Sequence, residues 1–111
     1  MAYGIFGNKI VMTKGDTVRL RVNIQQKRTG EMYKPHNGDK LRFALKRYIS
    51  NRTVELEKDI PTDTMILTLT EEDTKTLDFG VYHYDIQLTY ANGYVDTIIQ
   101  NGLLELKYEV N

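Results

Sequence analysis

Hydrophobic and polar residues alternate along several short segments of this chain, with the period of two that a strand with one buried face produces. The clearest segment runs from Val18 to Ile24, where every second residue is aliphatic and the residues between them are Arg or Asn. Further strands are predicted over residues 9–12, 41–46, 53–60, 64–70, 81–90, 94–100 and 104–110. The pattern therefore indicates seven or eight strands, each with one face in a core.

Turn and loop signals separate these segments. Gly15 lies in a short polar stretch and supplies permissive backbone dihedral angles, and Pro61 ends a strand because it lacks the backbone donor of a sheet ladder. Residues 26–38 are polar and include glycines and a proline, which predicts a long loop. Long loops in compact domains often carry binding functions, so a ligand at this loop is an open possibility.

Two glycine-containing stretches near the end of the chain predict the path of the last strands. Asn92 and Gly93 follow Ala91 and favour a hairpin in which both residues take positive φ. Asn101 and Gly102 form either a second hairpin or, in the interpretation we prefer, a bulge within one continuous strand.

One short helix is predicted. Thr70 precedes three acidic residues, which is typical of a helix N-cap and first turn, so Glu71–Leu77 is expected to form one helical turn. Residues 1–7 are expected to form an arm or a short edge strand. Many short strands with almost no helix predict an all-β fold, an antiparallel β-sandwich.

Length and composition are consistent with one domain over residues 1–111. The chain has 111 residues with ordinary globular proportions, 41% hydrophobic and 27% charged, and contains no cysteine, so no disulfide framework is expected. The first ten residues lack the pattern of a signal peptide, and no apolar stretch approaches the roughly 20 residues that span a bilayer. We expect synthesis in the cytoplasm and no membrane partner.

Charge is distributed unevenly, although the net charge is zero. Residues 1–58 contain thirteen Lys and Arg against five Asp and Glu, and residues 59–111 contain two against ten, so the halves carry +8 and −8. This asymmetry fits charge-complementary stacking between subunits or a nucleic-acid face. It also fits a single sandwich in which early strands lie beside late strands and pair their charges, which is the interpretation we favour.

Candidate catalytic and metal-binding residues are few. His36 falls in the long loop and His83 on an outward strand face, without the spacing of a metal site, so both are interpreted as surface residues. The carboxylates Glu55, Glu57 and Asp59 share a strand face and in principle form a pair, but no apolar residue flanks them to raise a pKa. Ser50, in a turn, lacks the surroundings of a nucleophile. We expect no enzyme, no metal and no cofactor.

Basic and aromatic residues suggest two kinds of recognition. We do not expect nucleic-acid binding, which would use Arg19, Arg21, Lys40, Arg42 and Lys46, with Tyr48 nearby. Tyrosines assigned to inward faces are Tyr82, Tyr84, Tyr90 and Tyr108. Those left in the arm or near loops, where a sugar or protein contact is possible, are Tyr3, Tyr33, Tyr48 and Tyr94.

The segment Asp78–Leu88 carries the spacing D-x-G-x-Y-x-Y. It resembles the corner and the F strand of immunoglobulin-like sandwiches, where a Gly turns the chain and a Tyr bonds back to the corner. Tyr84 occupies the position that is a disulfide cysteine in antibody domains, so the resemblance is architectural. It implies an immunoglobulin-like sandwich in which Tyr82 fixes the corner.

Further segments carry a second resemblance: KGDT at 14–17, YKP at 33–35, GDKLRF at 38–43, GVYHYDI at 80–86 and DTII at 96–99. Together they resemble small prophage proteins of Gram-positive bacteria, similar to the N-terminal immunoglobulin-like domain of phage baseplate upper proteins. The resemblance implies a non-enzymatic phage structural or assembly protein that docks to a tail, a baseplate or its own copies, and so a place in the virion. The alternative is a β-sandwich module that recognises carbohydrate, through Tyr33, Tyr48 or Tyr94, or protein.

Overall fold

The alternating segments form short strands in this computed structural model, which describes residues 3–6, 9–24, 30–48 and 53–108. These residues contain eight strands: β1 (Tyr3–Phe6), β2 (Lys9–Thr13), β3 (Val18–Arg21), β4 (Lys40–Lys46), β5 (Leu56–Ile60), β6 (Ile66–Leu69), β7 (Gly80–Thr89) and β8 (Val95–Lys107). One helix, α1 (Glu71–Thr74), lies between β6 and β7. The all-β prediction is confirmed.

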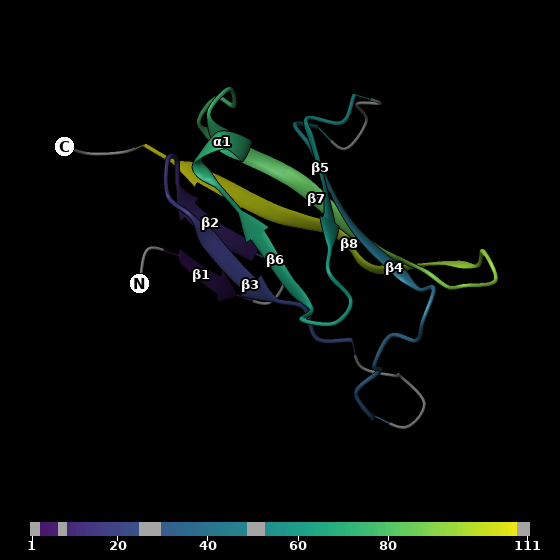
Figure 1. Cartoon of the computed structure of the whole chain (residues 1–111). Helices are drawn as coiled ribbons and strands as arrows, with labels where there is room; N and C mark the ends of the chain where they lie inside the picture. Colours follow the sequence, from purple (N-terminus) through teal and green to yellow (C-terminus); the bar gives the residue numbers. More distant parts are fainter. Residues whose placement is uncertain (1–2, 7–8, 25–29, 49–52, 109–111) are drawn as a thin grey trace.

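The strands form two sheets (Figure 1). The larger sheet has the order β1-β2-β8-β7-β4-β5, and the smaller one consists of β3 and β6. Neighbouring strands are antiparallel except β2 and β8, which run parallel with Lys9 beside Leu103. The prediction of a purely antiparallel fold is therefore wrong at this pair. A period of two is the same in both directions, and no hairpin joins β2 to β8 to set their direction.

A single hydrophobic core lies between the two sheets. Both sheets contribute aliphatic side chains to it, and the rings of Phe43 and Tyr84 meet there with centroids 5.4 Å apart. The predicted inward positions of three segments are confirmed as buried: Val18, Leu20, Val22 and Ile24; Leu41, Phe43 and Leu45; Tyr82, Tyr84, Ile86 and Leu88. The alternation thus assigned the faces of β3, β4 and β7.

The last two strands form the predicted hairpin. The backbone N–H of Tyr90 donates to the carbonyl of Tyr94 at 2.7 Å, and Gly93 has φ of 93°. Asn92 does not adopt positive φ, so that part of the prediction is wrong. Gly93 alone adopts the left-handed conformation in this turn.

β8 continues through Asn101 and Gly102 without a second hairpin. Opposite β7, Tyr84 pairs with Gly102 and Ile86 with Ile99, so β8 carries one extra residue over this interval. This confirms the bulge that we preferred.

Several boundaries differ from the predictions. Helix α1 ends at Thr74 rather than Leu77, and β5 begins at Leu56 rather than Thr53. Tyr108 was assigned to the core but is 68% exposed, because β8 ends at Lys107 and the chain leaves the sheet there. Within the predicted arm, Tyr3–Phe6 forms an edge strand, and the rest of residues 1–7 lies outside the described residues.

No helix in the described part of the chain has the length and apolar character needed to cross a membrane.

Candidate functional site

The strand register creates two ends of the molecule, which lie on opposite sides in Figure 1. The loop end comprises residues 30–39 of the β3–β4 connection and residues 91–94 of the β7–β8 turn. The helix end comprises the turn at residues 14–17, helix α1, and the residues around Phe79 and Tyr108. Each end presents exposed aromatic side chains, so we describe both.

Asp39 connects the two segments of the loop end. Its carboxylate is buried, and Oδ2 accepts hydrogen bonds from the Tyr33 hydroxyl at 2.7 Å and the His36 N–H at 2.8 Å. Oδ1 accepts from the N–H of Ala91 at 3.0 Å, 52 residues further along the chain. These hydrogen bonds lower the pKa of Asp39 below its ordinary 3.8, and the bond from Tyr33 contributes most. The side chain of Asp39 is therefore a carboxylate at neutral pH.

Tyr33 is half-buried and serves this network. Its hydrogen bond to Asp39, together with burial, raises its pKa to about 12. The ring makes edge contacts with His36 at 5.6 Å and with Tyr90 at 6.0 Å between centroids. Tyr33 therefore acts as a structural donor, and His36 lies beside it as an exposed residue, as predicted.

Gly38 allows the loop to approach the β7–β8 turn closely. It has φ of +94°, and a Cβ atom placed there would lie 2.9 Å from the Cβ of Ala91. The backbone conformation and the space both require glycine at this position. The loop and the turn consequently form one connected surface.

Tyr94 and Val95 of the turn, together with Met32 of the loop, are exposed apolar residues of this end. Tyr94 and Val95 are 75% and 56% exposed and follow the turn that Asp39 holds. A surface depression lined by Tyr90, Asn92, Tyr94, Val95 and Asp96 lies beside them. An exposed aromatic and an exposed β-branched residue on a fixed hairpin are suited to protein contact.

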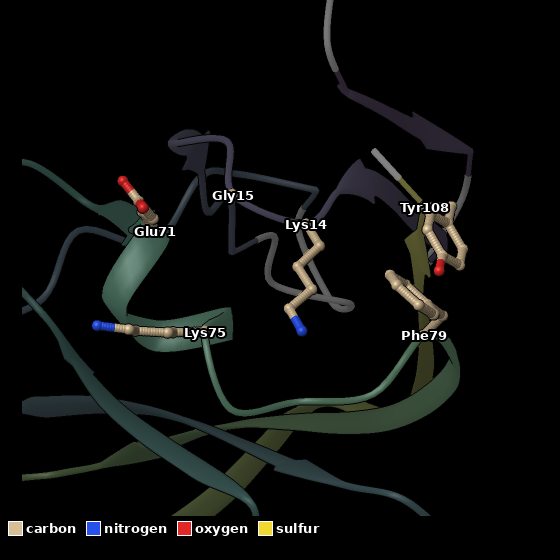
Figure 2. Close-up of a pocket in the computed structure, with 6 residues that line it drawn as sticks. All are labelled: Lys14, Gly15, Glu71, Lys75, Phe79 and Tyr108. Atoms are coloured by element: carbon tan, nitrogen blue, oxygen red, sulfur yellow. The ribbon is translucent and has the colours of Figure 1, made fainter. Parts of the chain in front are cut away.

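The helix end contains a pocket of about 340 Å³ (Figure 2). Phe79 and Tyr108 stack at its side with centroids 3.7 Å apart and planes inclined by 22°. The Lys14 ammonium lies 5.4 Å from the centre of the Phe79 ring, and Glu71 of helix α1 and its C-cap residue Lys75 line the opposite side. The pocket lining therefore combines two aromatic rings with two lysines and one glutamate.

Thr70 is the N-cap of helix α1, as the sequence predicted, and it forms a capping box with Asp73. The N–H of Thr70 donates to Asp73 Oδ2 at 2.8 Å, and the N–H of Asp73 donates to the Thr70 hydroxyl at 3.3 Å. Lys58 of β5 reaches the same carboxylate at 2.8 Å. The short helix is thereby tied to the edge strand of the large sheet.

The other residues singled out for chemistry are not brought together. His83 is half-buried on the outer face of β7, with an Nδ1 atom that has no hydrogen-bond partner within the described part of the chain. The carboxylates of Glu57 and Asp59 each lie 3.8 Å from the guanidinium of Arg42, so each forms an exposed ion pair with it. Ser50 falls outside the described residues. Within those residues, no group of three or more metal-ligating side chains is present.

The basic residues do not form one face. Arg19 and Arg21 are exposed on the small sheet, whereas Lys40 and Arg42 are exposed on the large one, so the outer faces that carry them belong to different layers. Lys46 is half-buried on β4. This division weakens the nucleic-acid hypothesis.

Strands from the basic first half of the sequence lie beside strands from the acidic second half. β4 lies beside β7 as expected, and Lys9 of β2 approaches Glu105 of β8 to 3.4 Å. The expected pairing of Asp85 with a basic residue stays a prediction. These contacts agree with the interpretation that early and late strands pair their charges in one molecule.

Asp39 and Phe79 are the residues that sequence reasoning missed. Asp39 lies in a polar turn and looks like any turn aspartate, since its partner Ala91 is distant in the sequence. Phe79 was noted only as part of the corner, and the structure shows its ring 37% exposed.

Comparison with protein-family models, with curated proteins and with solved structures finds no match for this chain.

Proposed function

We propose that this chain is a non-enzymatic docking protein of a phage or prophage, with an immunoglobulin-like sandwich as its scaffold. The order β8-β7-β4-β5 opposite β3 and β6 corresponds to the strand order G-F-C-C′ opposite B and E of that fold. The Tyr82 hydroxyl donates to the Asp78 carbonyl at 2.7 Å, which is the hydrogen bond of a tyrosine corner. The phage assignment is supported by the resemblance described above.

The loop end is the docking surface in this proposal. The observation that carries it is the exposure of Tyr94 and Val95 on a hairpin that Asp39 fixes to a second loop. Fixing the backbone in advance lowers the conformational entropy lost on binding, so a small apolar patch is sufficient for useful affinity. In an immunoglobulin-like fold the corresponding B–C and F–G loops are those that bind partners in variable domains.

The partner is a tail or baseplate protein or a second copy of the chain. Exposed edge strands at β1 and β5 offer additional pairing positions for such assembly. The opposite charges of the two halves favour contacts between copies that weaken as salt screens them.

Sedimentation and co-purification with phage particles test the proposal. The double variant Tyr94→Ala, Val95→Ser should lose self-association or incorporation into particles, whereas the matched control Tyr48→Ala, an exposed tyrosine away from the loop end, should retain it. A protein that stays monomeric at low salt and is absent from particles of an induced prophage contradicts the proposal.

The carbohydrate alternative through Tyr33, Tyr48 and Tyr94 has less support. Tyr33 uses its hydroxyl for Asp39, and Tyr48 follows β4 at the end of the sheet opposite to Tyr94. The three tyrosines therefore do not form one stacking platform. A glycan array on which the Tyr33→Ala variant loses binding would revive this alternative.

A further inference from the structure

Asn-Gly pairs occur at three places in the chain, at residues 37–38, 92–93 and 101–102. In such a pair the side-chain amide of Asn is open to attack by the backbone nitrogen of the next residue. Glycine favours this reaction because it has no side chain to hinder the approach and leaves the backbone free to rotate. The folded chain engages the reacting groups of the three pairs in different ways.

The pair at 101–102 is held within a strand. β8 continues through both residues, and Gly102 is buried and pairs with Tyr84 of β7. The reaction closes a ring between the Asn side chain and the following backbone nitrogen, which an extended strand paired with its neighbour does not allow. The large sheet therefore protects this pair.

The pair at 92–93 lies in an exposed turn, but both of its reacting groups are engaged. The N–H of Gly93 donates to the carbonyl of Tyr90 at 2.8 Å. The Oδ1 atom of Asn92 accepts a hydrogen bond from the N–H of Tyr94 at 3.0 Å. The nitrogen has to leave its acceptor, and the side-chain amide its fixed orientation, before the two groups meet, so the reaction is slowed here.

The pair at 37–38 is exposed at the loop end, and its reacting groups are not engaged. The N–H of Asp39 donates to the His36 carbonyl at 3.0 Å, so Asn37 and Gly38 occupy the two central positions of this turn. In the part of the chain that the structure describes, no hydrogen bond uses the side chain of Asn37 or the N–H of Gly38. The nitrogen and the amide are therefore both open to reaction.

We propose that Asn37 is a site of spontaneous deamidation, a modification that goes beyond the docking function. The nitrogen of Gly38 gives up its proton through water and bonds to Cγ of Asn37. The Cγ–Nδ2 bond breaks as Nδ2 takes a proton and leaves as ammonia, and a succinimide ring remains. Water then opens the ring: addition at Cγ gives aspartate, and addition at the backbone carbonyl gives isoaspartate, in which the main chain runs through the former side chain.

Isoaspartate at position 37 disconnects the two segments of the loop end. It adds one backbone atom directly before Gly38, where a Cβ atom would already lie 2.9 Å from the Cβ of Ala91. It also shifts Asp39, whose carboxylate has to stay near the Ala91 N–H that it now accepts from at 3.0 Å. Both products add a negative charge two residues before that carboxylate. Deamidation therefore releases the loop from the β7–β8 turn as the protein ages.

Incubation of the folded protein at neutral pH, followed by digestion and peptide mass spectrometry, tests the site. Position 37 should deamidate first, and position 92 about tenfold more slowly, because the N–H of Gly93 has to leave its acceptor. The rate at position 37 should rise with pH, since the Gly38 nitrogen reacts once it has lost its proton. In chemically denatured protein all three positions should react at similar rates, because the fold no longer distinguishes them.

Hydrogen exchange at the Ala91 amide measures the effect on the loop end. Exchange should be faster in the aged fraction that carries isoaspartate at position 37, with the amides of helix α1 unchanged. Asn37→Asp adds the charge without the extra backbone atom and should keep most of the protection. Treatment with an isoaspartyl methyltransferase and S-adenosylmethionine, which returns isoaspartate to aspartate, should restore the aged fraction to the level of that variant.

Two serine variants provide a matched pair, since serine cannot form the succinimide. Asn37→Ser should keep the Ala91 amide protected throughout incubation. Asn92→Ser removes the more slowly reacting amide, so its loss of protection with time should follow that of the unmodified protein.

Two results would overturn the proposal. Deamidation at position 92 that is as fast as at position 37 in the folded protein excludes Asn37 as the preferred site. Unchanged exchange at Ala91 in the isoaspartate form shows that the loop accommodates the longer backbone and is not released. None of these measurements uses a partner, so failure here leaves the docking proposal standing, and failure of docking leaves this site standing.

Discussion

Each end of the molecule is organised by one aspartate, but the two aspartates connect the chain over different distances. Asp73 at the helix end bonds to Thr70, three residues before it, and to Lys58, fifteen residues before it. Asp39 at the loop end bonds to Ala91, 52 residues after it. Local capping therefore starts helix α1, whereas the connection between the two segments of the loop end exists only after the sheet has formed.

The causes of the lowered pKa also differ between Asp39 and Asp73. At Asp39 the hydrogen bond from Tyr33 is the main cause of the lowered pKa. At Asp73 the largest influence is burial, which raises the pKa, but the bonds from Lys58 and Thr70 together outweigh it and the pKa is lowered. Both carboxylates are ionised at neutral pH, so both ends keep their connections under ordinary conditions.

Removing Asp39 should have the largest effect. Asp39→Ala deletes three accepted hydrogen bonds and leaves the hydroxyl of Tyr33 and the N–H of Ala91 without their acceptor. We expect the melting temperature to fall by about 10 °C. Hydrogen exchange at the Ala91 amide should accelerate, while the amides of helix α1 should be unchanged. Unaltered protection at Ala91 would show that the two segments are not held by this carboxylate.

The loop end should also respond to pH at both extremes. Because the folded pKa of Asp39 is depressed, its contribution to stability is complete above pH 3.8 and is lost as pH falls through the lower folded value. Because the pKa of Tyr33 is raised from 10.0 to about 12, its contribution is complete below pH 10 and is lost as pH rises toward 12.

NMR titration of the Tyr33 ring carbon measures the alkaline step directly. In the Asp39→Asn variant the midpoint should move down toward 10, since the main cause of the shift is gone. A Tyr33 midpoint near 10 in the unmodified protein would contradict the network.

Gly38 and Gly93 form a matched pair for testing the close approach at the loop end. Their φ angles are +94° and +93°, but a Cβ atom on Gly38 meets Ala91 and one on Gly93 meets nothing within 4 Å. Gly38→Ala should cost about 2 kcal/mol and Gly93→Ala about 1 kcal/mol, the latter from backbone strain alone.

Adding Ala91→Gly separates contact from strain. The double variant Gly38→Ala, Ala91→Gly lacks the 2.9 Å approach and should recover most of the difference between the two single glycine variants. Chemical denaturation gives the four free energies of unfolding. A Gly38→Ala variant no less stable than Gly93→Ala would mean that the loop is not packed on the turn.

The helix end should lose less when its aspartate is removed. Asp73→Ala deletes the capping box and the Lys58 contact, at a cost of about 1.5 kcal/mol. Lys58→Met removes only the second interaction and should cost less than half of that. Equal losses in the two variants, measured by denaturant unfolding, would show that the ion pair rather than the cap stabilises this end.

The sequence predicts interactions of short range well. Alternation identified the buried faces of β3, β4 and β7, and the acidic residues after Thr70 predicted the helix N-cap. Both depend on residues within a few positions of one another. Tyr108 was assigned wrongly by the same rule, since the alternation does not reveal where the strand leaves the sheet.

Interactions of long range could not be predicted in this way. The parallel pairing of β2 with β8 and the bond from Ala91 to Asp39 join residues far apart in the chain, and no local pattern encodes either partner. The pocket at the helix end was missed for the same reason, because Lys14, Phe79 and Tyr108 are brought together only by the folded sheet. Candidate sites built from three separate segments need the structure.

Tyr82 tests the corner at the helix end and should give a smaller change than Asp73→Ala. Tyr82→Phe removes the hydroxyl that bonds to the Asp78 carbonyl at 2.7 Å but keeps the buried ring beneath Arg47, whose guanidinium lies 4.8 Å from its centre. We expect a loss of about 1 kcal/mol in the free energy of unfolding, with assembly retained. Phe43→Leu, a change in the core that removes no hydroxyl, calibrates the measurement. An unchanged melting midpoint in Tyr82→Phe would mean that the turn at Gly80 and the packing of the ring hold the corner without the hydroxyl, and that the tyrosine-corner interpretation is wrong.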